Sequence, residues 1–257
     1  MMKINKKIAD QLGIEVGRYD THTHIFEHKL IKTKNLRYKP SYDAKIETLL
    51  DHLNKNKIDK AFLVQPSFNK NNNDYILQKI KRHKNRFYTV GVLHEKRPLK
   101  DFKKLLKNKF IGVRLNLFKK QIFKFNKEWK QVFKLMINNK IHLEIYIENN
   151  RLASLINSLP IELIKIIDHC GAIKKDHDVA WIDKINNPVN LFVKCTYPLR
   201  LKKEFKEGDR LMKKFVKTFS KKVGKDYILW GSDFPWTSYE KKIKSYRQVI
   251  NTAKAYG

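Results

Sequence analysis

Short apolar, β-branched runs alternate along the chain with longer stretches in which apolar residues recur every three or four positions. Runs of four to eight such residues predict buried strands, and the longer stretches predict amphipathic helices. Eight runs are present: YDTH (19–22), KAFLVQ (60–65), FYTVGVL (87–93), IGVRLN (111–116), HLEIYI (142–147), LIKIID (163–168), NLFVKC (190–195) and YILWGS (227–232). This alternation is typical of β/α units that build a parallel sheet.

The stretches between the runs each carry one apolar stripe, which predicts a helix packed on the sheet. In SYDAKIETLLDHL (41–53), Pro40 and Ser41 mark the expected start of a helix. The stripes comprise Ile46, Leu49, Leu50 and Leu53; Trp129, Val132, Phe133 and Met136; Met212, Phe215, Val216 and Phe219; and Ile243, Tyr246, Ile250 and Ala253.

Eight strands alternating with helices in 257 residues match the size of one (β/α)8 barrel. We therefore predict an α/β fold, a single TIM barrel in one domain spanning residues 1–257. A doubly wound open sheet is the alternative, but no G-x-G-x-x-G or G-x-x-x-x-G-K motif supports a nucleotide site. The Asn-rich stretch 69–74 is short enough to be a loop between a strand and a helix.

The formal charge of +31 raises the question of nucleic-acid binding, because clustered basic residues attract phosphates. Lysine accounts for most of the excess, with 46 Lys against 10 Arg, and it is spread along the whole chain. No zinc-finger spacing, aromatic RNA-binding signature or polybasic tail accompanies it. We expect no nucleic-acid partner, whereas the charge favours a small anionic substrate.

Cysteine content and apolar run lengths indicate the compartment. The two cysteines, Cys170 and Cys195, cannot form a disulfide framework or a cysteine-rich zinc site. The first residues, MMKINKKIADQLGI, lack the apolar core of a signal peptide, and no run approaches the roughly 20 apolar residues of a membrane span. We expect a cytoplasmic protein with no membrane partner.

Polar side chains end every predicted strand. In a TIM barrel the carboxyl ends of the strands converge on the active site, so these residues are candidates for chemistry. In strand order they are His22 and His24, Gln65, His94, Arg114 and Asn116, Tyr146 and Glu148, Asp168 and His169, Lys194 and Thr196, and Asp233. A lone aspartate there is often a helix cap, and a lone histidine is often structural. The joint pattern instead favours a site, in which Asp233 of strand eight lies beside His22 and His24 of strand one.

The sequence resembles a known family, the amidohydrolase superfamily, and within it the 2-pyrone-4,6-dicarboxylate lactonase branch of TIM-barrel hydrolases. The resemblance rests on HTHIF, RYKPSYDA, FLVQPS, GVRLN, IIDHCG, KCTYPLR and WGSDFP, in family order between residues 18 and 236. The H-x-H motif alone is weak, whereas DHCG followed by GSDFP is more specific. The resemblance implies an enzyme that hydrolyses a carboxylic ester bond in a lactone ring.

The resemblance also implies roles for particular residues. Asp233 would be the general base that takes a proton from water, while His22, His24 and His169 would polarise the lactone carbonyl and stabilise its oxyanion. The expected substrate-binding residues are Arg114, Arg200, Lys120, Tyr38, Tyr146 and Gln65. Lys120 stands where the family has a further arginine, which keeps the charge but loses the planar fork that pairs with a carboxylate.

Many members of the superfamily bind one or two divalent metals. The resemblance to the lactonase branch implies a metal-independent design, so the first choice is that no cofactor is required. Arg114 and Tyr146 stand where metal-binding members have a bridging ligand and a histidine, which argues against a site with two metals. A cation at the Arg114 position would also repel a second metal. A single Zn²⁺ held by His22, His24, His169 and Asp233 is the second choice, since imidazole and carboxylate suit zinc in that number.

Two other functions compete with the lactonase hypothesis. One is a metal-dependent decarboxylase of the same superfamily, and the other is a non-enzymatic binder of anions or nucleic acid that uses the +31 charge. A binder has little use for three histidines and Asp233 at the strand ends, which favours the enzyme. The sequence fits an anionic sugar-acid lactone as well as a pyrone dicarboxylate, and it leaves the oligomeric state open.

Overall fold

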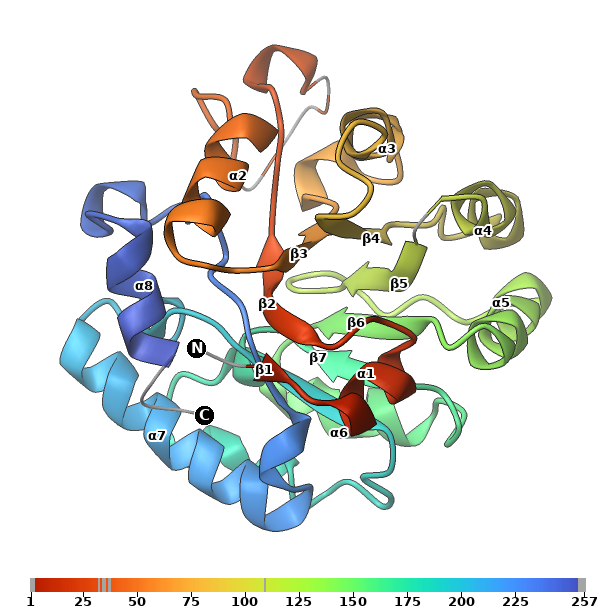
Figure 1. Ribbon diagram of the computed structural model, residues 1–257. Helices are drawn as coiled ribbons and strands as arrows, with labels where there is room; N and C mark the ends of the chain where they lie inside the picture. Colours follow the sequence, from red (N-terminus) through yellow and green to blue (C-terminus); the bar gives the residue numbers. More distant parts are fainter. Residues whose placement is uncertain (1–2, 32, 34–35, 37, 109, 254–257) are drawn as a thin grey trace.

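The computed structural model describes residues 3–31, 33, 36, 38–108 and 110–253, which form one curled sheet with helices around it (Figure 1). The strands are β1 Lys3–Ile4, β2 Gly17–Thr23, β3 Lys60–Val64, β4 Phe87–Gly91, β5 Phe110–Asn116, β6 His142–Tyr146, β7 Lys165–Ile167, β8 Leu191–Cys195 and β9 Ile228–Trp230. The helices are α1 Lys6–Leu12, α2 Ile46–Lys55, α3 Asp74–Ile80, α4 Pro98–Leu106, α5 Lys127–Asn138, α6 Asn149–Asn157, α7 Phe205–Lys222 and α8 Tyr246–Ala253.

The sheet runs in the order β1 to β9, and β2 to β9 are parallel. Each predicted strand overlaps one of these eight, so the predicted (β/α)8 barrel is confirmed as the fold. The last strand meets the first through an irregular seam, not through a regular ladder. There the Asp233 amide donates to the His22 carbonyl at 2.8 Å, and the His24 amide donates to the Phe234 carbonyl at 2.8 Å. This seam places Asp233 beside the two histidines, as a closed barrel requires.

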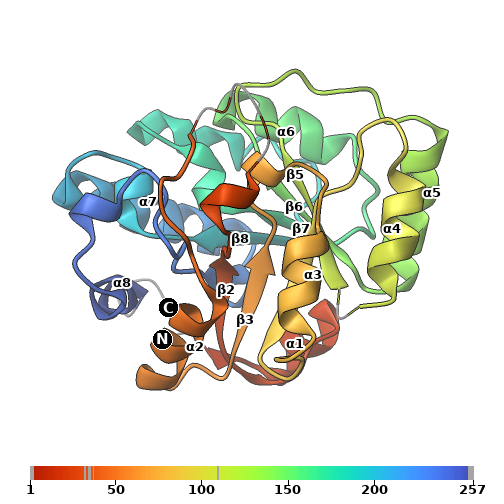
Figure 2. The ribbon, with the colours of Figure 1, turned by 90° about the horizontal axis from the view of Figure 1, so that it is seen from above.

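The amino end of the barrel is closed by a segment that the sequence analysis did not predict. Strand β1 pairs antiparallel with β2, and α1 lies below the strands while their carboxyl ends point the other way (Figure 2). Helix α1 begins after Asn5, whose side chain accepts from the Ile8 amide at 3.0 Å, and ends at Gly13 in the left-handed region, φ 66°. Its buried residues pack on the apolar interior of the barrel. Helix α1 therefore shields that interior from water.

Helix α2 begins later than predicted. It starts at Ile46, five residues after the expected start at Ser41. The cause is an antiparallel bridge in which Phe26 and Ala44 exchange backbone hydrogen bonds of 2.9 and 2.8 Å, which keeps this segment extended. The beginning of the RYKPSYDA motif, Arg37, lies outside the described residues.

The remaining predicted stripes lie on α5, α7 and α8, and most of their side chains are buried against the outer face of the sheet. Ile243 is buried but precedes α8, and the side chain of Ala253 lies outside the described part of the chain. Within the described ranges, no helix combines the length and apolar character needed to cross a bilayer.

Candidate active site

A β-bulge in β2 turns the two histidines of the H-x-H motif into the barrel. Asp20 pairs with Ala61 of β3 and Thr23 pairs with Leu63, so β2 contains one residue more than β3 between these two pairs. Tyr19 packs in the apolar interior, and regular alternation from it would direct the histidines outward. The extra residue reverses this alternation, so that His22 and His24 face the interior with ring centroids 5.0 Å apart.

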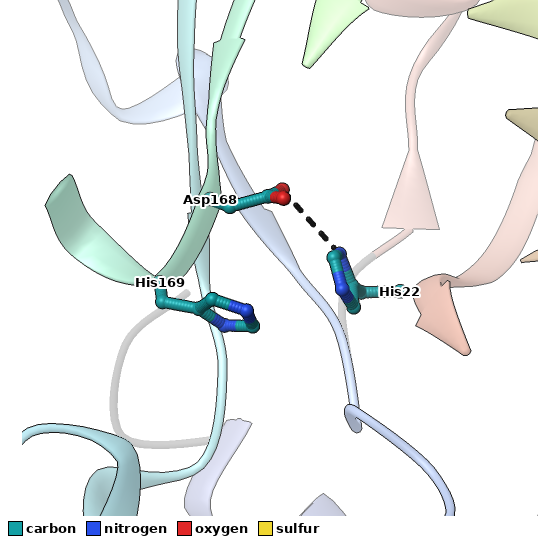
Figure 3. Close-up of side chains that lie close together, drawn as sticks. All are labelled: His22, Asp168 and His169. Carbon is teal, nitrogen blue, oxygen red and sulfur yellow. Dashed lines mark ion pairs between the residues drawn. The ribbon is translucent and has the colours of Figure 1, made fainter. Parts of the chain in front are cut away.

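His169 reaches the same centre through an unusual turn after β7. Residues 169–172 all have φ in the left-handed region, at 52°, 55°, 69° and 54°. A left-handed residue with a side chain costs about 1–2 kcal/mol, and only Gly171 escapes that cost. The buried turn directs the His169 ring toward His22, with 4.9 Å between the ring centroids (Figure 3). Such strain is typical of functional sites, where the surrounding packing maintains it.

Hydrogen bonds at Nδ1 orient two of the three imidazoles. His24 Nδ1 lies 2.7 Å from the Val64 carbonyl, which can only accept, so Nδ1 carries a proton. His169 Nδ1 lies 2.9 Å from the Thr196 hydroxyl. Burial lowers the pKa of His22 and of His169 well below the ordinary 6.5, so both rings are neutral near pH 7. The protonated Nδ1 of His24 directs its Nε2 toward Asp233.

Asp233 lies between the histidines and an arginine. Its Oδ1 is 3.5 Å from His24 Nε2 and 3.8 Å from His22 Nε2, and its Oδ2 accepts a short hydrogen bond from Arg200 Nε. Burial alone would raise the pKa of Asp233, but the Arg200 guanidinium and the neighbouring imidazoles hold this pKa well below its usual range. Asp233 is therefore ionised at neutral pH, with Oδ1 directed at the imidazoles.

The sequence places Asp168 at a strand end and predicts no role for it. In the structure its Oδ1 lies 3.4 Å from His22 Nδ1, and its Oδ2 accepts from Arg114 Nε at 3.0 Å (Figure 3). All three side chains are buried. The one available signal was its place directly before His169 at the end of a strand.

A cavity of about 410 Å³ opens beside Arg114, above the ends of β4 and β5. Its lining includes Lys70, His94, Lys96, Arg114 and Lys120, with Glu95 as its one carboxylate among the described residues. The sequence predicts His94 at the end of a strand, but β4 ends three residues earlier, at Gly91. The two predicted substrate-binding residues in this lining, Arg114 and Lys120, thus share one cationic cavity.

Arg200 and Tyr38, both predicted to bind substrate, contact the loop that follows β9. Arg200 donates to Asp233 and to the Thr237 hydroxyl at 3.2 Å, and its guanidinium lies 5.1 Å from the Tyr239 ring centroid. Tyr38 donates to the carboxylate of Glu240. Arg200 is therefore in direct contact with the candidate base, while Tyr38 anchors a neighbouring loop.

Tyr146 and Gln65, the other predicted substrate-binding residues, lie at the carboxyl ends of β6 and β3. The Tyr146 ring stacks on Phe118 at 4.8 Å and meets the edge of His169 at 4.9 Å. Gln65 donates to the carbonyl oxygens of Asn72 at 2.5 Å and Lys70 at 3.3 Å, and its Oε1 is buried without a hydrogen-bond partner among the described residues. Tyr146 thus belongs to the histidine cluster, whereas Gln65 holds a loop.

A buried ion pair lies beneath the histidines. Lys194 donates a short hydrogen bond to Glu144, which also lies 3.1 Å from His142 Nε2. After burial, the Lys194 charge is the largest cause that lowers the pKa of His22. The sequence analysis named Lys194 as a strand end but did not foresee this pair, because strands β6 and β8 are not neighbours in the sheet.

The residues of the centre fit one divalent metal ion. Two groups, His22 with Asp168 and His169, and His22 with His24 and Asp233, place their ligand atoms within 4.8 Å of one another. Both His22 nitrogens, Asp168 Oδ1 and Asp233 Oδ1 are buried without a hydrogen-bond partner in the described ranges. Imidazole nitrogens and carboxylate oxygens are suitable ligands for zinc. Arg114, 3.0 Å from Asp168, opposes a second ion next to the first.

Comparison with known proteins assigns the family. A sequence model of the family described as Amidohydrolase matches residues 19–253. The chain belongs to the amidohydrolase family. That membership supports an enzymatic function. The matched residues include the three site histidines, Arg114, Arg200 and Asp233. A search of curated proteins found no match.

Solved structures share the fold of this amidohydrolase. A candidate 2-pyrone-4,6-dicarboxylic acid hydrolase from Acinetobacter baumannii, with citric acid bound, is 24% identical, with a TM-score of 0.85 over 93% of this chain and 92% of that one. A candidate of the same name from Pseudomonas putida is 23% identical, with a TM-score of 0.82 over 95% and 92%. The 5-carboxyvanillate decarboxylase of Novosphingobium aromaticivorans, with manganese, is 11% identical, with a TM-score of 0.59 over 91% and 92%.

Proposed function

We propose that this amidohydrolase opens the lactone ring of a small carboxylated substrate, such as a 2-pyrone-4,6-dicarboxylate or a sugar-acid lactone. The observation that carries the proposal is the convergence of Asp233 with His22, His24 and His169 beside a cationic cavity. One carboxylate and three imidazoles are suited to acid–base chemistry, and the cavity suits an anionic substrate.

Asp233 is proposed to activate water. It is ionised, and its Oδ1 faces the centre without a hydrogen bond from any described residue. As the water oxygen attacks the lactone carbonyl, Asp233 accepts one of its protons. The ring carbon–oxygen bond then breaks, and the leaving oxygen takes up the proton that Asp233 accepted, which returns Asp233 to its ionised form. The new carboxylic acid loses its own proton to the solvent. A substrate carboxylate that binds the remaining N–H groups of Arg200 would weaken its pairing with Asp233 and make Asp233 a stronger base.

His22 and His24 are proposed to orient the attacking water. His24 has its proton on Nδ1, so its Nε2 offers a lone pair that can accept from the water. His169 is proposed to stabilise the charge that develops on the carbonyl oxygen, because its Nδ1 can accept from the Thr196 hydroxyl and its Nε2 can then donate. Preorganised groups of this kind contribute about 10²–10³-fold each to the rate. A divalent metal held by His22, His24, His169 and Asp233 would supply the same polarisation and would lower the pKa of a bound water. We favour the arrangement that requires no metal.

Arg114 and Lys120 are proposed to bind a substrate carboxylate in the cationic cavity, while Arg200 binds a second near Asp233. Arginine pairs with a carboxylate through two parallel hydrogen bonds, whereas lysine acts as a point charge. The names of the two candidate dicarboxylic acid hydrolases, and the citric acid bound in one of them, support a polycarboxylate substrate.

A metal-dependent decarboxylase is the second candidate. The two groups of potential ligands favour it, as does the fold shared with the manganese-bound decarboxylase. A metal-dependent enzyme loses activity when the metal is removed, and it acts on a carboxylate substrate that need not contain an ester.

The test is a panel of carboxylated lactones assayed by proton release, with wild type and Asp233→Asn. We expect Asp233→Asn to lose 10²–10⁴-fold in kcat/KM, the range of general base catalysis, while the exposed control Asp59→Asn keeps full activity. Each protein is assayed before and after chelation, and with Zn²⁺ or Mn²⁺ added. Retained lactone hydrolysis in Asp233→Asn contradicts the base assignment, and chelator-sensitive turnover contradicts the metal-free arrangement.

A further inference from the structure

The carboxylate of Asp168 contacts two groups to which the proposed chemistry gives separate tasks. One oxygen, Oδ2, accepts from Nε of Arg114 at 3.0 Å, and the other, Oδ1, lies 3.4 Å from Nδ1 of His22. The three side chains come from β5, the turn after β7 and β2, and Figure 3 shows the carboxylate directed at the His22 ring. Asp168 is 0% exposed, so water does not compete for either contact.

The contact with Arg114 determines which of its N–H groups are available to a ligand. Because Asp168 occupies Nε, the terminal nitrogens of the guanidinium are left for the cavity that Arg114 lines. The guanidinium is planar, so a fixed Nε also fixes the plane in which a carboxylate can pair with the fork. Without Asp168, a long side chain would have to be ordered anew each time a ligand binds.

The contact with His22 determines the tautomer of that ring. A neutral imidazole has one N–H, and both His22 nitrogens lack a hydrogen-bond partner among the described residues. The carboxylate of Asp168, 3.4 Å from Nδ1, is nearer than that of Asp233, 3.8 Å from Nε2, and a carboxylate can only accept, so a proton on Nδ1 is favoured and Nε2 is left as a lone pair. His22 would then be the same tautomer as His24, whose Nδ1 donates to the Val64 carbonyl.

We propose that Asp168 is a positioning residue, which holds the plane of Arg114 and the tautomer of His22 in one arrangement. The inference rests on the proposed function for the tasks of these two residues, but the arrangement itself is a property of the resting protein. Arg114 and His22 are thus both held by the carboxylate of Asp168. A change at Asp168 therefore alters binding and turnover together, although Asp168 touches no substrate.

The first test requires no substrate. In ¹⁵N-histidine NMR spectra, with the His22 signals assigned through His22→Gln, we expect wild type to carry the proton on His22 Nδ1. We expect Asp168→Asn to lose this preference, because the side-chain amide offers a donor as well as an acceptor. The control is Asp176→Asn, which removes an exposed carboxylate paired with Arg210, and it should leave the His22 signals unchanged.

The second test measures anion binding without turnover. The probe is pyridine-2,4-dicarboxylate, a planar dicarboxylate that contains no ester, titrated by calorimetry. We expect Asp168→Asn to bind it at least tenfold more weakly than wild type and Asp176→Asn do. In kinetic assays, Asp168→Asn should raise KM for carboxylated lactones and lower kcat, whereas for an uncharged lactone only kcat should fall.

Two outcomes overturn the proposal. One is a wild-type His22 that carries its proton on Nε2, which needs no variant and so does not depend on the folding of Asp168→Asn. The other is an Asp168→Asn protein that melts at a lower temperature but keeps the wild-type tautomer and dicarboxylate affinity, which would make the residue merely structural. Absence of lactone hydrolysis in wild type would instead contradict the proposed function, while the NMR test would still stand.

Discussion

The lower and upper halves of the barrel interior are built from the same strands but have opposite chemistry. The lower half, above α1, is filled by apolar side chains such as Tyr19, Phe62, Phe192 and Leu229. The upper half contains three histidines, two carboxylates and Arg114, all buried. Burial of apolar surface stabilises the fold, whereas burial of charge costs free energy unless each charge is paired. Within the barrel interior, the lower half therefore stabilises the fold, whereas the buried charges of the upper half reduce that stability.

The boundary between the halves is the Glu144–Lys194 pair. Both side chains are 0% exposed, and the Lys194 ammonium lies 5.5 Å from the centroid of the Phe62 ring in the apolar half. A buried pair adds little stability in itself, but removal of one partner leaves an uncompensated charge. The pair also places a positive charge below His22. It thus connects the electrostatics of the site with the packing of the core.

The largest expected effect comes from a cavity in the lower half. Phe192→Ala should lower the free energy of unfolding by about 3–5 kcal/mol, because a fully buried ring is removed from a packed interior. Below the unfolding transition, kcat/KM for each folded molecule should stay near wild type. Urea denaturation measures the first quantity and lactone assays the second. Phe205→Ala, at an exposed ring, is the control and should cost under about 1 kcal/mol.

The opposite result is expected in the upper half. His169→Gln should reduce kcat by about 10²-fold or more, because it removes a preorganised group from the reaction centre. Its melting temperature should stay within a few degrees of wild type, since no apolar core is lost. His177→Gln, at a ring whose side chain is 77% exposed, is the matched control and should change neither quantity. If His169→Gln unfolds the protein while Phe192→Ala inactivates it, the division between the halves is wrong.

A gradual effect, a dependence of stability on pH, is expected at the amino end of β7. Lys165 is buried and donates to the carbonyl oxygens of Pro160 and Ile161, and burial lowers its pKa from 10.5 to about 8. Between these values the unfolded chain binds more protons than the folded one, so this residue makes stability rise as pH increases. We expect the stability of wild type relative to Lys165→Met to increase from pH 8 to pH 10.5 in urea titrations. A constant or falling difference contradicts the assignment.

The sequence predicted the eight parallel strands because a strand buried on both faces is a near-continuous apolar run. It also predicted which strand ends carry polar groups, and three histidines and Asp233 do converge in the structure. The same rule failed for β1 and α1. Helix α1 has only seven residues, too few for a stripe to stand out, and β1 has two.

Other features depend on backbone conformation, which a pattern of residue types does not record. The left-handed turn at 169–172 contains a single glycine, so three of its four residues give no sign of positive φ. Asp233 also has positive φ, at 61°. The contacts of Asp168 with His22 and Arg114 join three different strands, and no local spacing encodes them. These contacts of Asp168 are therefore visible only in the three-dimensional structure.

The β-bulge in β2 has a consequence for how such a site can be gained or lost. Tyr19 and His22 both face the interior although three positions separate them, and the extra residue between Asp20 and Thr23 is what allows this. A regular strand of the present length would turn both histidine rings into the outer apolar layer, whereas deletion of Thr21 would remove the bulge and keep both rings inward. The spacing between the inward apolar residue and the histidine pair therefore indicates whether a relative needs the bulge: an odd spacing requires it and an even spacing does not.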